Sequence, residues 1–316
     1  MIQKPLFNVI ITTYNRAHLL PRAICSVLNQ TYQNFELIII NGGSSDGTEK
    51  VVKSFKDKRI RYGKQTKNKG MLADRNMGFD LSKGKYVTLL DDDDELLPEA
   101  LETAVNEFSE RSSDGIGILW FNCVESRNRE LTGKGINTSG YVSYEDNLCG
   151  KVYGNFWEVI NSDLIDEDAR FDERLWGREI MFWLKLHKRT KVFYVHRVLR
   201  INHTECSTVS TAEDQLKHVS RIILTEKAFL KKYGNLRRHL CPKKYGQDLA
   251  TLGVWQILNG EKVEGRRTLI NAFKYTQTLS VYIFFPLSFF FNKNQIISIY
   301  LKFLKIKGLF LKKARA

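Results

Sequence analysis

The sequence predicts an α/β protein with an open, mostly parallel sheet flanked by helices, followed by a helical C-terminal extension. Strand and helix signals alternate through the first 110 residues, the pattern of parallel strands connected by helices. Hydrophobic residues make up 43% of the chain and charged residues 27%, which fits a globular protein and excludes wholesale disorder. At 316 residues, the chain is long enough for one large α/β domain with an appendage.

Short apolar runs predict the strands, and apolar side chains at helical spacing predict the helices. Phe7 to Thr12 is an apolar run with β-branched residues, which predicts the first strand. The first helix is predicted over 17–30, where the apolar positions are Leu19, Leu20, Ala23, Ile24, Val27 and Leu28. The same signals predict strands at 36–40, 60–62 and 86–90, and helices at 46–55, 72–81 and 98–108. In such a sheet, the ligand site lies at the carboxyl ends of the strands.

Four consecutive aspartates, Asp91 to Asp94, directly follow the apolar run Tyr86 to Leu90. Adjacent carboxylates repel one another and are costly to desolvate, so a buried strand rarely ends in this way without a counter-charge. Carboxylate oxygens suit Mg²⁺ or Mn²⁺, and Mg²⁺ is commonly shared between one or two carboxylates and the phosphates of a substrate. The segment therefore predicts a divalent cation site, with a solvated acidic turn as the alternative.

The turn after the first strand, Thr12-Thr13-Tyr14-Asn15-Arg16, contains no glycine. A glycine-rich phosphate loop at this point is typical of dinucleotide-binding folds and P-loops, so both are disfavoured. The five cysteines are scattered without a CxxC pair and provide no metal framework. The phosphates of a ligand would need another counter-charge, which a cation at the aspartate run can supply.

Four motifs follow one another along the chain: Thr-Thr-Tyr-Asn-Arg (12–16), Asn-Gly-Gly-Ser-Ser-Asp-Gly-Thr (41–48), Asn-Lys-Gly with Arg-Asn-Met-Gly (68–70 and 75–78), and Leu-Leu-Asp-Asp-Asp-Asp (89–94). In this order and spacing they resemble glycosyltransferase family 2, over roughly residues 5–205. The resemblance implies a GT-A fold over residues 1–210, with a Rossmann-like nucleotide half (1–110) and an acceptor half (111–210). It also implies an inverting transfer from a nucleotide sugar, usually with a divalent metal.

The resemblance implies that the nucleobase of the donor is bound by Thr13, Tyr14, Asn41 and Arg75. An aromatic face and a hydroxyl at a strand end can enclose a pyrimidine, and an acceptor at position 41 can take its imino proton. The family most often has aspartate where this chain has Asn41, so an amide oxygen replaces a charge-assisted acceptor. These residues favour a UDP-sugar as the donor.

Alignment on Tyr-Val-x-Leu-Leu makes Asp91 and Asp93 the DxD pair of the family. Residues i and i+2 of a strand share a face, so the two can converge on one ion and one ribose-diphosphate. We expect Asp93 to bind the metal directly, and Asp91 to contact the ribose or reach the metal through water. His203 lies in a segment that resembles the polar loop closing over the diphosphate; it could bind the metal or a phosphate, or be a structural hydrogen-bonding residue.

An inverting transfer needs a base that removes the proton of the acceptor hydroxyl. Residues 171–186 resemble the second signature of the family, an FDE segment followed by a glycine, an acidic pair and a helix. Here the pair is Arg178-Glu179, and the position of the base falls on Glu179, with Asp172 and Glu173 as alternatives. A surface carboxylate at a helix start is the structural alternative. Trp157 is expected in the acceptor half, where an aromatic ring beside a sugar is natural.

The net charge of +14 resides entirely in the last third of the chain. Residues 211–316 hold 20 of the 49 Lys and Arg but 6 of the 35 Asp and Glu, which leaves 29 of each sign in residues 1–210. Residues 279–291 form an apolar run that contains Pro286 and is too short to span a bilayer. A basic amphipathic pattern follows over 296–313, with one arc formed by Lys302, Lys305, Lys312 and Lys313. The segment 279–311 is therefore predicted to lie in an anionic membrane interface, with packing on the protein or insertion as alternatives.

The predicted function is that of a metal-dependent, inverting glycosyltransferase using Mg²⁺ or Mn²⁺, with a polyprenyl-linked glycan or another glycolipid as acceptor. The N-terminus lacks the long apolar core of a signal peptide, so we expect a cytoplasmic protein that is peripheral on the inner face of the cell membrane. A sugar-nucleotide pyrophosphorylase is one alternative, although it should carry a glycine-rich loop after its first strand. A non-catalytic module that binds membrane or another polyanion is the second. Nucleic acid is not expected as a partner, because the basic residues alternate with aliphatic runs.

Overall fold

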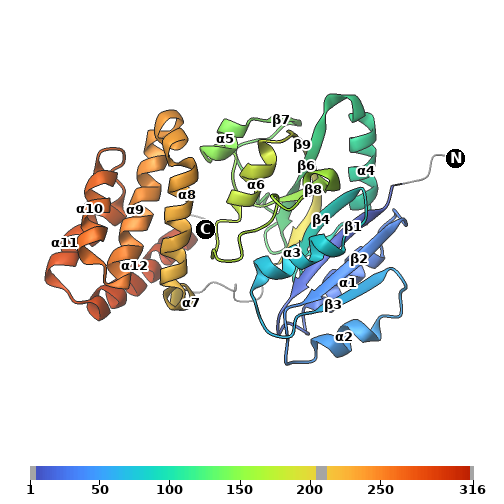
Figure 1. Cartoon of the computed structure of the whole chain (residues 1–316), viewed down its shortest axis with the longest axis horizontal. Coiled ribbons are helices and arrows are strands. Elements are labelled where there is room, and N and C mark those ends of the chain that lie inside the picture. Colours follow the sequence, from blue (N-terminus) through green and yellow to red (C-terminus); the bar gives the residue numbers. More distant parts are fainter. Residues whose placement is uncertain (1–4, 204–211, 314–316) are drawn as a thin grey trace. The chain divides into compact units, whose positions relative to one another are not determined.

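The computed structural model describes residues 5–203 and 212–313, with only the backbone described at 212–214 and 305–313. The chain divides into two compact units. Unit 1 comprises residues 1–173 and 179–206 and contains the sheet, whereas unit 2 comprises residues 174–178 and 207–316 and is helical (Figure 1).

Unit 1 is built on a mixed sheet, in which the described residues form nine strands. Their order is β3-β2-β1-β4-β8-β6-β9-β5, and β7 pairs with β9. The strands are β1 (Phe7–Thr13), β2 (Phe35–Asn41), β3 (Ile60–Lys64), β4 (Tyr86–Asp91), β5 (Glu95–Leu96), β6 (Ile116–Glu125), β7 (Gly140–Val142), β8 (Phe156–Asn161) and β9 (Lys191–Asn202). The block from β3 to β4 is parallel, and β8 joins it antiparallel to both β4 and β6.

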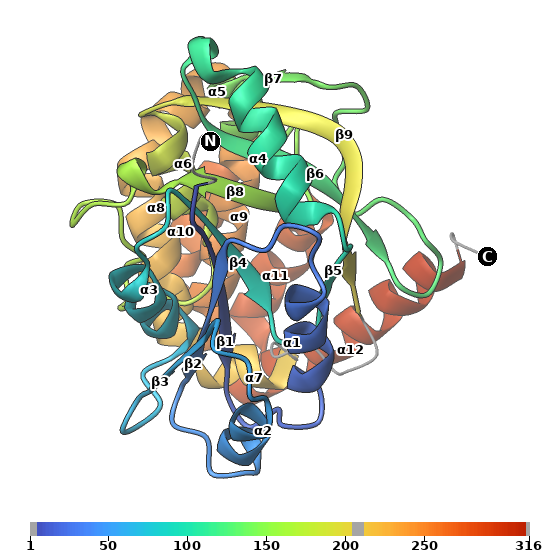
Figure 2. The same ribbon diagram turned by 90° about the vertical axis from the view of Figure 1, so that its right-hand side faces the viewer.

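Helices cover both faces of this sheet (Figure 2). On one face, α1 (Leu20–Leu28), α2 (Thr48–Ser54) and α4 (Ala100–Glu110) pack over a core that includes Ile11, Leu37 and Ile39. On the other face, α3 (Met71–Leu81) and α6 (Ile180–His187) pack over a core that includes Ile10 and Ile40, and α5 (Tyr144–Leu148) contacts α6. Successive residues of a strand point to opposite faces, which is why Ile39 and Ile40 belong to different cores.

The carboxyl ends of β1, β2 and β4 meet at one edge of the sheet. Thr13 lies opposite Asn41, and Thr12 lies opposite Asp91. Parallel pairing thus brings the first, second and fourth sequence motifs together, as expected for an open α/β sheet.

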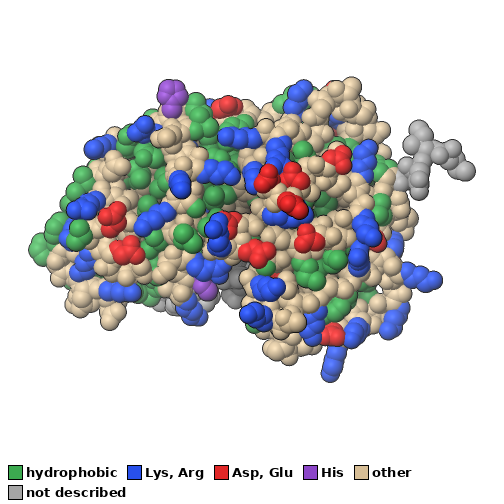
Figure 3. All heavy atoms as spheres, in the orientation of Figure 1, with side chains coloured by type: hydrophobic (Ala, Val, Ile, Leu, Met, Phe, Trp, Pro, Cys, Tyr) green, Lys and Arg blue, Asp and Glu red, His purple; other side chains and the backbone are tan. Residues whose placement is uncertain are grey.

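Unit 2 consists of helices in its described part: α7 (Ala212–Lys217), α8 (Val219–Leu240), α9 (Pro242–Asn259), α10 (Lys262–Phe273), α11 (Leu279–Phe290) and α12 (Lys293–Lys313). Their shared core includes Val281 and Phe284 of α11 together with Ile296 and Tyr300 of α12. Hydrophobic side chains interspersed with Lys and Arg also remain at the surface over this part of the chain (Figure 3). No helix in the described ranges combines the length and the apolar character needed to cross a membrane.

The predicted α/β fold with a helical C-terminal region is confirmed. The strands and helices expected within the first 110 residues are all present, with small shifts at their ends. In the C-terminal region, α11 continues through Pro286. Part of α11 and α12 packs within unit 2, whereas the exposed Lys302 is the only member of the predicted basic arc whose side chain is described.

Candidate active site

The aspartate run forms a tight turn at the end of β4. The strand ends at Asp91, and the amide of Asp94 donates a hydrogen bond to the Asp91 carbonyl oxygen (3.1 Å). Arg16, from the first motif, binds the carboxylates of Asp92 (2.6 Å) and Asp93 (2.5 Å). Because strand alternation stops at Asp91, Asp91 and Asp93 do not lie on one strand face, and the assignment of Asp93 to a metal stays a prediction.

Arg200 neutralises the other two aspartates of the run. Its buried guanidinium on β9 binds Asp91 at 2.6 Å and also binds Asp94. Burial acts to raise the pKa of Asp91, but the charges of Arg200 and Arg75 outweigh it and hold that pKa below its ordinary value. At Asp94 burial prevails and the pKa is raised, and at Asp92 burial raises the pKa to about 6. Neighbouring carboxyls of the turn therefore differ in acidity.

Arg75 connects the aspartate turn to the predicted base. This buried side chain comes from α3; one of its nitrogens lies 3.1 Å from a carboxylate oxygen of Asp91, and another binds the carboxylate of Glu179. Glu179 stands immediately before the first residue of α6, and its side chain is 33% exposed. The structure thus brings together three of the predicted site residues, which are separated widely in the sequence.

The FDE segment is attached to α3 by Asn76. The Asn76 amide group donates to the carbonyl oxygen of Phe171 and accepts from the Phe171 amide, each at 3.0 Å. It also donates to the Glu173 carboxylate at 3.0 Å. Asp172 lies between these two residues and is half-buried. Because Asn76 follows Arg75 on α3, these bonds place both alternative bases near the arginine that binds Glu179.

The residue before Glu179 has a strained backbone and a firmly held side chain. Arg178 has φ of 53°, in the left-handed region that costs a non-glycine residue roughly 1–2 kcal/mol. Within unit 2, the Arg178 guanidinium binds Glu226 and Asp248 (2.9 Å) and lies 4.2 Å from the centroid of the Phe229 ring. Strained residues held by their surroundings cluster at functional sites. The backbone leading into Glu179 has this character.

Asn41 is engaged by its own turn. Its side-chain oxygen accepts hydrogen bonds from the amides of Gly43 (3.1 Å) and Ser44 (2.8 Å), and its nitrogen donates to the Tyr62 hydroxyl (2.9 Å). A bond from Asn41 to the imino group of a base would compete with these turn bonds. Its part in base recognition stays a prediction.

The remaining predicted residues occupy different environments. Thr13 is buried at the end of β1, and the Tyr14 side chain that follows is 43% exposed and accessible to a ligand. His203 lies beside the aspartate turn, where a ring nitrogen is 2.5 Å from the Glu95 carboxylate. Trp157 is fully buried in the core on the α1 and α4 side of the sheet. This burial corrects the expectation that Trp157 contacts the acceptor, because no part of its ring is open to a sugar.

Arg16, Arg200 and Glu158 have no role that was predicted from the sequence. The need of four aspartates for counter-charge could have pointed to the arginines, since each lies within a segment that resembles the family. Glu158 lies on β8 opposite Trp120, so it faces the α3 and α6 side of the sheet. Burial raises the pKa of Glu158 to about 8; the charge of Glu179 adds to this effect, whereas Arg200 and Arg75 oppose it. No sequence signal marks Glu158 as part of the site.

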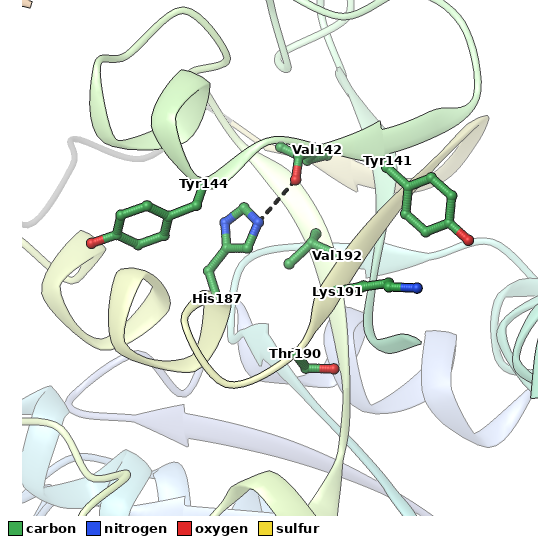
Figure 4. A pocket seen from close by; sticks show the side chains of 7 residues that line it. All are labelled: Tyr141, Val142, Tyr144, His187, Thr190, Lys191 and Val192. Carbon is green, nitrogen blue, oxygen red and sulfur yellow. Dashed lines mark hydrogen bonds between the residues drawn. The ribbon is translucent and has the colours of Figure 1, made fainter. Parts of the chain in front are cut away.

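A separate hollow of about 450 Å³ lies at the start of β9 (Figure 4). It is lined by Tyr141, Val142, Tyr144, His187, Thr190, Lys191 and Val192. The His187 ring is held there by a 2.9 Å hydrogen bond to the Val142 carbonyl oxygen. Arg200 and His203 are at the opposite end of β9, so this hollow is not part of the candidate active site.

The family described as Glycosyl transferase family 2 matches residues 8–191, more than half of the chain. The chain therefore belongs to glycosyltransferase family 2 and is a glycosyltransferase, which confirms the resemblance seen in its motifs.

Among characterised proteins, the GalNAc(5)-diNAcBac-PP-undecaprenol beta-1,3-glucosyltransferase of Campylobacter jejuni is 36% identical over 204 residues, or 62% of this chain. The match covers 64% of the Campylobacter protein, which is less than two thirds of its length. A glycosyltransferase of Rickettsia prowazekii is 28% identical over 269 residues, which is 82% of each chain. The crystal structure of S. aureus TarS 1–349 in complex with UDP-GlcNAc shares the fold, with a TM-score of 0.59 and 16% identity over 79% of this chain and 81% of TarS.

Proposed function

We propose that this glycosyltransferase moves a sugar, with inversion, from a UDP-sugar to a hydroxyl of a lipid-linked glycan, with Mg²⁺ or Mn²⁺ at the aspartate turn. The observation that carries the proposal is the series of ion pairs from Glu179 through Arg75 and Asp91 to Arg200. Glycosyl transfer needs cationic groups for the departing diphosphate and a base near the acceptor hydroxyl. These ion pairs support the proposal, because a candidate for each role takes part in them.

The arginines are suited to bind the diphosphate. A guanidinium group offers planar, paired donors that match carboxylate and phosphate equally well. Arg16, Arg75 and Arg200 all bind carboxylates of the aspartate turn. We infer that an entering diphosphate takes over some of these donors, so that the arginines stabilise charge on the leaving nucleoside diphosphate.

The carboxylates of the turn fit a hard divalent cation. The Asp91 side chain is 41% exposed, and Asp93 offers a second accessible carboxylate. Within the ranges described, no three His, Cys, Asp or Glu side chains converge to hold an ion by themselves. We therefore expect Asp93 to hold the cation together with diphosphate oxygens, while Asp91 contacts the ribose or a metal-bound water and His203 is a further candidate ligand. The bound cation would neutralise charge on the leaving group.

Glu179 is the proposed base. Its carboxylate can take the proton of the acceptor hydroxyl as the new glycosidic bond forms and the bond to the diphosphate breaks. Its partial exposure leaves it reachable by an acceptor, and its position before α6 is fixed by the Arg75 pair. Asp172 and Glu173, in the same segment, are the alternatives.

The proposed acceptor is a glycan linked to a polyprenyl or similar lipid on the cytoplasmic face of the membrane. The Campylobacter relative supports this choice, since its name describes an undecaprenol-linked substrate. The basic excess of residues 211–316 and the exposed apolar side chains of α11 support a peripheral position on an anionic membrane. These are features of unit 2, whereas the donor site is proposed in unit 1.

A thermal-shift panel of UDP-, GDP- and dTDP-sugars with Mn²⁺, followed by product analysis, tests the proposal. The TarS crystals contain UDP-GlcNAc or UDP, so UDP-sugars come first in the panel. A ligand at 100 times its Kd should stabilise the protein by about 2.7 kcal/mol. Release of nucleoside diphosphate from the nucleotide sugar indicates glycosyl transfer or donor hydrolysis. A pyrophosphorylase would instead release pyrophosphate when given a nucleoside triphosphate and a sugar 1-phosphate, and activity in neither assay indicates a non-catalytic module.

A further inference from the structure

Asp74, on the first turn of α3, is a buried carboxyl group with an open hydrogen-bonding position. It is 3% exposed, and its Oδ1 atom is buried without a hydrogen-bond partner in the described part of the chain. Buried polar atoms are paired in the great majority of cases, and leaving one unpaired costs roughly 1–3 kcal/mol. Such an atom at a site edge calls for an explanation, and a ligand is one.

The Asp74 carboxyl lies against the end of β2. A Cβ atom added to Gly42 would be 2.4 Å from Oδ2 of Asp74. Gly42 follows the last residue of β2, and its amide donates to the Thr13 carbonyl oxygen (2.9 Å). The carboxyl group therefore sits beside the point where β1 and β2 end.

Strand alternation explains why Asp74, and not Asn41, faces this side. Ile40 points into the core under α3, so Asn41 points to the opposite face of the sheet. There its amide nitrogen donates a hydrogen bond to the Tyr62 hydroxyl. Position 42 returns to the α3 side but has no side chain. The carboxyl group of Asp74 occupies the place that a side chain at position 42 would fill.

A hollow of about 300 Å³ lies beside α3; Asp74 does not line it, but Gln65, Lys69 and Glu173 do. The same three residues affect the pKa of the Asp74 carboxyl. Burial raises this pKa to about 6; Gln65 and Lys69 lower it, whereas Glu173 adds to the increase. At neutral pH the group is thus mainly an anion, able to accept hydrogen bonds but not to donate one.

We propose that Asp74 determines the base specificity of the donor site by accepting the ring N–H that lies between the two carbonyl groups of uracil or thymine. This inference rests on the proposed function. Cytosine presents a bare nitrogen acceptor at the same ring position, and a carboxylate facing it would be left unpaired. The chain therefore carries on α3 the acceptor that Asn41, engaged by its own turn, does not offer.

The test measures the affinity of UDP, 3-methyl-UDP and CDP, each with Mg²⁺, for the full chain and for its Asp74→Asn and Asp74→Ala variants. The wild-type protein should bind UDP at least about tenfold more tightly than 3-methyl-UDP or CDP, because both analogues lack the ring N–H. Asp74→Asn should reduce the UDP-over-CDP ratio to near one, since an amide can donate to cytosine. In Asp74→Ala, 3-methyl-UDP should bind almost as tightly as UDP. A methyl group that weakens binding only when the Asp74 carboxyl is present indicates that the two are in contact. Glu110→Gln changes an exposed carboxyl of α4, 68% exposed, and should leave every ratio unchanged.

The outcomes separate this inference from the proposed function. If the variants bind all three nucleotides less tightly but keep the wild-type ratios, Asp74 is structural and the inference is overturned while nucleotide binding stands. Wild-type discrimination against 3-methyl-UDP needs no variant, so its absence overturns the inference even if both substitutions prevent folding. If the wild-type protein binds no nucleoside diphosphate, the proposed function fails and the inference fails with it.

Discussion

Arg75 binds Glu179 and Asp91 at the same time, through separate nitrogens of one guanidinium group. The proposed base and the aspartate turn thus share a buried cation, and a change at either carboxylate alters the partner left to the other. An arginine in this position can stabilise the ionised form of a base and also contact a diphosphate.

Glu179→Gln should lower the rate of transfer by about 10²–10⁴-fold while leaving donor affinity near that of the wild-type protein. The amide keeps the size of the side chain and one acceptor for Arg75, but it cannot take a proton from the acceptor hydroxyl. Initial rates and donor Kd, measured on the same preparations, check this. Asp172→Asn and Glu173→Gln serve as matched variants in the same segment. If one of them is inactive and Glu179→Gln is active, the base has been misassigned.

Asp93→Ala should abolish transfer and remove the Mn²⁺-dependent part of the thermal shift seen with donor. Asp92→Ala should retain much of both, although Arg16 binds the two carboxylates equally closely. The reason is location: Asp92 is buried, whereas Asp93 is more accessible to a cation and a diphosphate. Equal losses in the two variants would mean that the DxD assignment across the four aspartates is misplaced.

The fold could be predicted because its signals are local. Apolar runs such as Phe7 to Thr12 and helical spacing such as that of Leu20, Ala23 and Ile24 each fall within one element. The order of elements then implies parallel pairing, so Thr13, Asn41 and Asp91 were expected at one edge of the sheet.

The partners of the site residues could not be predicted, because they depend on contacts distant in sequence. Arg200 reaches Asp91 across 109 positions, and no pattern within either segment encodes that pair. The turn bonds of Asn41 were likewise not predicted, although a side-chain oxygen two residues before a turn is well placed to accept the amides of Gly43 and Ser44. The burial of Trp157 could not be predicted either, because the alternation of side chains along β8 does not reveal which face of the strand is covered by the core.

Glu158 should make the stability of the protein depend on pH. Its pKa is raised from 4.5 to about 8 by burial, so between these values the folded protein holds a proton that the unfolded chain releases. The contribution of Glu158 to the free energy of unfolding should therefore fall as the pH rises from 4.5 to 8. Above pH 8 this contribution should change little. Glu158→Gln resembles the protonated form and should remove this contribution. In urea unfolding at pH 5, 7 and 9, the free energy of unfolding of Glu158→Gln should increase relative to that of the wild-type protein as the pH rises. A difference that stays constant with pH would contradict the raised pKa.

The exposed apolar side chains at the two ends of α11 should control membrane binding. Leu279 is 62% exposed and Phe290 is 82% exposed, whereas Val281 and Phe284 of the same helix are buried in the core of unit 2. Deleting the helix would remove that core, so the substitutions Leu279→Ser and Phe290→Ser, made together, are the sharper test. Burying a Leu or Phe side chain is worth roughly 1.5–3 kcal/mol, so sedimentation with anionic liposomes should weaken by at least about tenfold.

The matched control is Leu224→Ser on α8, which changes a side chain of comparable exposure (48%) in the same unit and should leave sedimentation unchanged. Salt separates the two contributions to binding. Each Lys or Arg near an anionic surface adds about 1 kcal/mol that high ionic strength screens, whereas apolar burial resists salt. The wild-type protein should therefore keep a salt-resistant fraction on the liposomes that the double variant lacks. If the double variant melts at the wild-type temperature and sediments as the wild-type protein does, these ends of α11 do not contact the membrane.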